Sequence, residues 1–134
     1  MLSSILGCSP EKESFTSIVE DGDWEISSHI YGANGVWHIE SNVHYSGHEQ
    51  IRIYWLDIIV PPPIEITARQ RSNSGLSKLK SETGDTISSS TLKGSENFSQ
   101  QEMKNILEKS YLTINYLVEG DNHWHEKRII LLKN

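Results

Sequence analysis

The chain has 134 residues, a length that favours a single domain with a real hydrophobic core. Its formal net charge is -6, from 12 Lys and Arg against 18 Asp and Glu, which argues against nucleic acid as a partner because phosphate binding needs clustered cations. The single cysteine excludes an internal disulfide, and no run of about 18 apolar residues is present that could cross a membrane as a helix.

The first eight residues, MLSSILGC, end in Ile5-Leu6-Gly7-Cys8. This tetrapeptide resembles the lipobox of bacterial lipoproteins, where apolar residues and a small residue precede the cysteine that receives the lipid. The resemblance implies that residues 1–8 are the remnant of a signal peptide and that Cys8 is the lipid attachment site. A complete signal peptide has a basic region and an apolar core of about 7–15 residues, so the true start would lie upstream. The alternatives are an unstructured amino terminus or a buried structural cysteine.

Residues 9–22 begin with the polar sequence SPEKES, which is typical of a flexible tether. Together with Cys8, this segment predicts a protein that is extracytoplasmic and lipid-anchored to the cell membrane. The membrane is then one partner, and an envelope protein or polymer ligand is a possible second.

The domain is expected to cover residues 23–134 and to begin with strands, because apolar and polar residues alternate from Trp24 onward. Asn34-Gly35 predicts a hairpin turn between the first two strands, since both residues tolerate positive φ. The apolar run 51–60 predicts a central strand buried on both sides at its far end, and Pro61-Pro62-Pro63 must end it.

The later elements are less regular. Residues 64–68 predict another strand, and the polar segment 76–93 could carry two weak strands around residues 82–85. Ser99-Gln100-Gln101-Glu102 is a capping box and predicts a short helix over about residues 100–109. Residues 112–118 and 123–132 are expected to form the last two strands.

About seven strands and one crossover helix predict an all-β fold, an antiparallel immunoglobulin-like β-sandwich. The helix before the penultimate strand resembles the crossover between the two sheets of an immunoglobulin-like domain, with Tyr111 in a tyrosine-corner role. With Cys8, the chain is similar to the small, largely uncharacterised Ig-like surface lipoproteins of Gram-positive bacteria. Fold analogy of this kind does not supply a function.

The histidines suggest one possible site. His123 and His125 have the spacing that places two imidazoles on one strand face, where they could bind Zn²⁺ or Cu²⁺. His38 or His44 could supply a third ligand only if the two strands meet on the same sheet face. The alternative is that all four are exposed surface histidines.

The sequence offers no catalytic or cofactor-binding motif: it has no Gly-x-Ser-x-Gly elbow, phosphate loop or calcium loop. The basic clusters Arg69-Gln70-Arg71 and Lys127-Arg128 are interpreted as solvated faces. We therefore expect no enzyme and no cofactor. The main hypothesis is a non-catalytic binding or structural module tethered to the outer face of a bacterial cytoplasmic membrane, and the alternative is a metal-binding surface lipoprotein.

Overall fold

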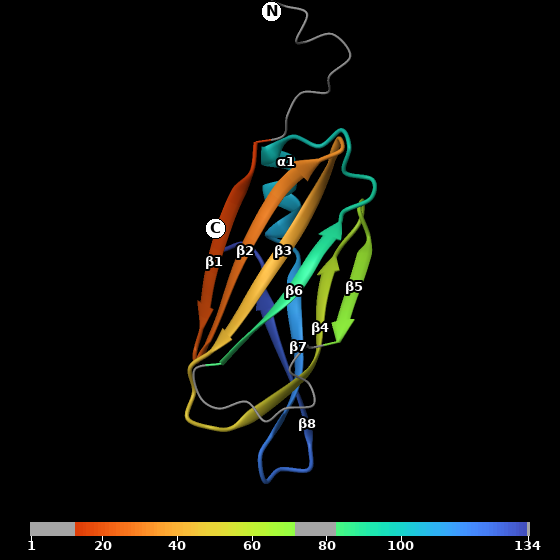
Figure 1. The fold of residues 1–134 in the computed structure, drawn as a ribbon. Coiled ribbons are helices and arrows are strands. Elements are labelled where there is room, and N and C mark those ends of the chain that lie inside the picture. Colours follow the sequence, from red (N-terminus) through yellow and green to blue (C-terminus); the bar gives the residue numbers. More distant parts are fainter. Residues whose placement is uncertain (1–12, 72–82, 134) are drawn as a thin grey trace, which may run out of the picture.

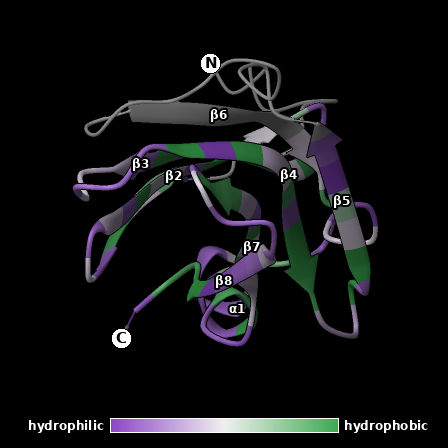
Figure 2. Ribbon diagram, turned by 90° about the horizontal axis from the view of Figure 1, so that it is seen from below, coloured by the Kyte–Doolittle hydropathy of each residue, from purple (hydrophilic) through white to green (hydrophobic). Residues whose placement is uncertain are grey.

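The structure is a computed structural model that describes residues 13–71 and 83–133. These residues form two four-stranded antiparallel sheets that pack as a sandwich, with one short helix (Figures 1 and 2). The strand order is β1-β2-β3-β6 in one sheet and β5-β4-β7-β8 in the other. The elements are β1 (Phe15–Asp21), β2 (Trp24–Ala33), β3 (Val36–Tyr45), β4 (Ile51–Val60), β5 (Ile66–Arg71), β6 (Thr83–Thr91), α1 (Gln100–Leu107), β7 (Tyr111–Val118) and β8 (Trp124–Ile130).

The β2–β3 hairpin follows the sequence prediction closely. All ten residues of β2 pair with β3, from Trp24 with Tyr45 to Ala33 with Val36. The two residues between the strands, Asn34 and Gly35, have φ values of 56° and 80°, as a two-residue turn of the primed type requires. This turn fixes the register of the hairpin. With that register, every second side chain of both strands points into the sandwich.

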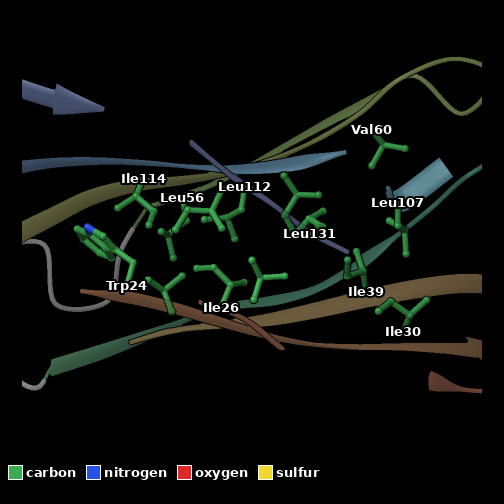
Figure 3. Close-up of a cluster of buried hydrophobic side chains, with 14 of the residues drawn as sticks. Trp24, Ile26, Ile30, Ile39, Leu56, Val60, Leu107, Leu112, Ile114 and Leu131 are labelled. Atoms are coloured by element: carbon green, nitrogen blue, oxygen red, sulfur yellow. The ribbon is translucent and has the colours of Figure 1, made fainter. Parts of the chain in front are cut away.

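The core lies between the sheets and consists of alternate side chains from both. In Figure 3, Trp24, Ile26 and Ile30 face Leu56, Leu112 and Ile114 across the interior. Each of these side chains is at most 6% exposed. Burial of large aliphatic and aromatic side chains contributes about 1.5–3 kcal/mol each, so this layer is a major favourable term in folding.

The helix α1 begins at the predicted capping box. The backbone N–H of Glu102 donates to Ser99 Oγ at 3.1 Å, and the backbone N–H of Ser99 donates to Glu102 Oε1 at 2.9 Å. In the chain, α1 follows β6 and precedes β7. Met103 and Leu107 are fully buried, so one face of the helix packs against the core of the sandwich. The predicted helix is confirmed, with its last residue at Leu107.

One prediction about the elements was wrong. Phe15–Asp21, expected within the tether, is the edge strand β1 and pairs with β2 over its whole length. Its inward side chain Ser17 donates to the carbonyl of Leu131 at 2.9 Å and so connects the strand to the carboxyl-terminal segment beside the other sheet. Of the polar segment 76–93, expected to carry two weak strands around residues 82–85, the described part forms β6 from Thr83 to Thr91. The part before Thr83, like the loop predicted at residues 72–75, lies outside the described residues.

Trp37→Ala should lower the free energy of unfolding by about 3–5 kcal/mol, because Trp37 is 1% exposed and its removal leaves a large cavity. The same substitution also leaves the carbonyl of Phe98 without its 2.9 Å bond from the indole N–H. Urea unfolding followed by circular dichroism measures the change. The matched variant Trp124→Ala, at a 58% exposed position, should change it by less than about 1 kcal/mol. Equal losses in the two variants would contradict the assignment of Trp37 to the core.

Candidate functional site

The residues predicted as sites do not come together. Cys8 lies outside the described residues. His38 and His44 are on β3 in one sheet, whereas His125 is on β8 in the other. The condition for a shared metal site, that these strands meet on one sheet face, is therefore not met.

The two ring nitrogens of His38 already have partners. Nε2 lies 3.1 Å from the carbonyl oxygen of Ala33, and Nδ1 lies 3.2 Å from the hydroxyl of Thr91. A neutral imidazole with its proton on Nε2 satisfies both contacts and leaves no lone pair for a metal. The ring stacks on Tyr31 at 5.3 Å between centroids, and Tyr31 stacks in turn on His29 at 5.0 Å. His38 is thus part of a stacked polar surface.

Asp121 explains the spacing of His123 and His125. Its Oδ1 accepts the backbone N–H of His123 at 2.9 Å, and its Oδ2 lies 2.9 Å from Nε2 of His125. His123 lies one residue before β8, which begins at Trp124, so only His125 is part of the strand expected to carry both histidines. The carboxylate of Asp121 organises the β7–β8 turn, and the ring of His125 stacks on Tyr116 at 5.3 Å.

Metal binding gains no support from this geometry. In the part of the chain that the structure describes, no three side chains of His, Cys, Asp or Glu converge as a metal ion requires. A tetrahedral zinc site needs at least three protein ligands.

A different surface does bring chemically distinctive residues together: the outer face of the β5-β4-β7-β8 sheet. In each of these strands, every second side chain points away from the core. The register of the strands aligns these outward side chains in rows across the sheet. One row joins Arg52, Leu117 and Trp124, and another joins Arg69, Asp57, Thr113 and Arg128. We call this surface the aromatic–arginine face and define it by Arg52, Tyr54, Trp55, Arg69, Tyr111, Trp124, Arg128 and Ile130.

The arginines on this face lie over aromatic rings. The guanidinium carbon is 4.3 Å from the ring centroid for Arg128 over Tyr111 and 5.2 Å for Arg69 over Trp55. Arg52 lies 5.9 Å from the ring centroid of Tyr54 and donates from Nη1 to its hydroxyl at 3.0 Å. Such cation–π contacts hold each guanidinium against the sheet while its edge stays accessible.

Two large apolar side chains on the face are exposed to solvent. Trp124 is 58% exposed and packs edge-on against Tyr54, with ring centroids 4.6 Å apart. Ile130, on the same strand, is 40% exposed. Trp and Tyr are enriched at the hot spots of binding surfaces.

A buried polar group lies at the centre of the face. The Asp57 side chain is only 7% exposed and accepts two hydrogen bonds from Arg69, at 2.8 Å from Nε and 3.0 Å from Nη2. The hydrogen bond and the charge of Asp57 raise the pKa of Arg69 above its ordinary value. Next to Asp57 across the ladder, Thr113 is 3% exposed and its Oγ1 has no hydrogen-bond partner. A buried hydroxyl without a partner is energetically costly.

The opposite outer face, on β1-β2-β3, has the reverse charge. Its outward parity carries Glu20, Glu25 and Glu40, and the sequences of these three strands contain no Lys or Arg. The aromatic–arginine face carries three arginines against Asp57, which is buried, and Glu126, whose side chain is 56% exposed. The two faces of the sandwich therefore differ in both charge and aromatic content.

Sequence reasoning identified parts of this face without recognising it. Arg69 and Arg128 belong to the two basic clusters that were interpreted as solvated surface. The available signal was the strand 51–60, in which Trp55 and Ile59 occupy the parity that faces away from the core. Only the strand order shows that these residues share a surface with Arg69, Arg128 and Trp124.

Comparisons with known proteins add no assignment. No model of a protein family matches the chain, and a search of curated proteins finds no similar sequence. Among the described residues, no helix combines the length and apolar character needed to cross a membrane.

The role of Asp121 in the β7–β8 turn can be tested by titration. Hydrogen bonds from the backbone of His123 first, and from the His125 side chain second, hold its pKa below the ordinary 3.8. A carboxylate with a lowered pKa stabilises the fold above its unfolded pKa, and that contribution is lost as the pH falls through the folded pKa. By carbon-13 NMR, His125→Gln should raise the pKa of Asp121 part of the way to 3.8. His44→Gln, on the other sheet, should leave it unchanged; a shift with His44→Gln but not with His125→Gln would contradict this role.

Proposed function

We propose that the chain is a non-catalytic binding module that holds a partner with its aromatic–arginine face. The observation that carries the proposal is the exposed Trp124, packed on Tyr54, on the same outer sheet face as guanidiniums that lie over aromatic rings. Trp, Tyr and Arg are the residues most enriched at binding hot spots.

We also propose that the fold is a variant of the immunoglobulin class. In that class, strands A, B and E lie together in one sheet, and strands C′, C, F and G lie in the other. The orders β2-β3-β6 and β5-β4-β7-β8 support this correspondence, with β1 added at the edge and α1 between strands E and F. Tyr111 is then the first residue of strand F, where a tyrosine corner is expected.

The module is placed, in this proposal, at the outer face of a bacterial cytoplasmic membrane by a lipid on Cys8. Residues 9–14 would connect the anchor to β1, which begins at Phe15. The ion pair between Lys127 Nζ and Asp21 Oδ1, at 3.2 Å, places the middle of β8 beside the last residue of β1, so the residues before Lys127 extend beyond that end of β1. Trp124 therefore lies toward the end of the sandwich away from Phe15, where a lipid anchor leaves it free to meet a partner.

Photocrosslinking tests the binding face. The chain with p-benzoylphenylalanine at position 124 should form discrete adducts with a bacterial envelope fraction. The matched position is Ile18, which is 67% exposed on β1 of the other sheet and should give none. Equal adducts from both positions, or adducts from Ile18 alone, would contradict the assignment of the face.

Cell fractionation tests the anchor. Expressed behind a complete signal peptide, the chain should partition with membranes, and Cys8→Ala should release it because the thiol that accepts the lipid is gone. Ser14→Ala is the matched control and should stay with the membranes. Membrane partition that persists in Cys8→Ala would rule out the anchor.

A further inference from the structure

We infer that the partner of the aromatic–arginine face is an acidic polypeptide surface, whose carboxylates bind the stacked guanidiniums and whose apolar side chains meet Trp124 and Ile130. This inference rests on the proposed function of the face and specifies the chemistry of its partner. It depends on the donors that remain accessible, on the charge of the two faces and on the order of the rows.

The stacked arginines keep hydrogen-bond donors for a partner. Arg69 uses Nε and Nη2 for Asp57, which leaves Nη1. Arg52 uses Nη1 for the hydroxyl of Tyr54, which leaves Nε and Nη2. Nη2 of Arg128 lies 3.8 Å from Oε1 of Glu126, which is too long for a strong hydrogen bond. The side chain of Arg128 is 59% exposed. A planar guanidinium fixed on an aromatic ring presents a fork that matches the two oxygens of a carboxylate.

The charge distribution selects an acidic partner and one orientation. The chain has a net charge of -6, yet the exposed heads on this face are three arginines and Glu126. The other outer face carries Glu20, Glu25 and Glu40, without Lys or Arg in its three described strands β1 to β3. An acidic partner is thus attracted to one face and repelled by the other, which is how complementary charges fix orientation.

The rows of the sheet favour a polypeptide over a simple polyanion. Along the strands, the row of Arg69 and Arg128 lies next to a row that joins Ile59, Tyr111 and Ile130. Phosphate chains and lipid headgroups would use the arginines but would leave the indole of Trp124 and the side chain of Ile130 in water. A polypeptide can offer carboxylates and apolar side chains in alternation, as the face requires.

The test uses the full, unacylated chain and a labelled random copolymer of glutamate and tyrosine, with binding followed by fluorescence anisotropy. Binding should weaken as salt is added, and R52Q/R128Q should bind at least about tenfold more weakly because each loses a charge-assisted hydrogen bond. The matched variant K93Q/K109Q removes the same charge from two exposed lysines and should bind within about twofold of the wild type. Arg69 is left intact because it neutralises the buried Asp57, and circular dichroism verifies that both variants fold.

Three results would overturn the inference. They are no binding of the copolymer, equal weakening in the two double variants, and equally tight binding of polyphosphate or of phosphatidylglycerol vesicles. If crosslinking at position 124 still yields envelope adducts while the copolymer does not bind, the face remains a binding surface and only the acidic polypeptide is excluded. If crosslinking at that position fails as well, the proposed function fails with it.

Discussion

A four-stranded sheet has two faces, and only one of them can be buried against the partner sheet. In this sandwich the inner faces are filled by Trp24, Ile26, Leu56, Leu112 and their neighbours, which are almost fully buried. The side chains of the outer faces do not have to pack in the core. Their composition is therefore informative about function. One outer face is acidic and carries histidines, as a solvated surface does, whereas the other gathers arginines over aromatic rings (Figure 2 shows the two layers end-on).

The Asp57–Arg69 pair lies at the centre of the aromatic–arginine face. A nearly buried carboxylate is unfavourable unless its charge is neutralised, and the bidentate geometry at 2.8 and 3.0 Å does this. The pair connects β4 to β5 and holds Arg69 over Trp55. The buried hydroxyl of Thr113 beside it remains without a partner, so the centre of the face is polar and incompletely satisfied.

Much of the fold could be predicted from the sequence, because turns and caps are local signals. Asn34-Gly35 and the Ser99 capping box both act within four residues of chain, and both are confirmed. The strand β1 was missed because its inner parity includes Ser17, whose bond to Leu131 comes from the far end of the chain. The partner of the histidine pair was not predicted either, because Asp121 binds the backbone of His123 and the ring of His125 from the turn before β8. The aromatic–arginine face needs the strand order of four segments, which no single segment encodes.

The most direct measurement of the central claim is hydroxyl-radical footprinting of the chain with and without a bacterial envelope fraction. If the aromatic–arginine face binds a partner, oxidation of Trp124 and Tyr54 should slow in the presence of the fraction, because contact excludes water from both rings. Oxidation of Ile18, the exposed apolar residue on the other sheet, should proceed at the same rate in both samples. Unchanged oxidation of Trp124 and Tyr54, or protection of Ile18 instead, would contradict the claim.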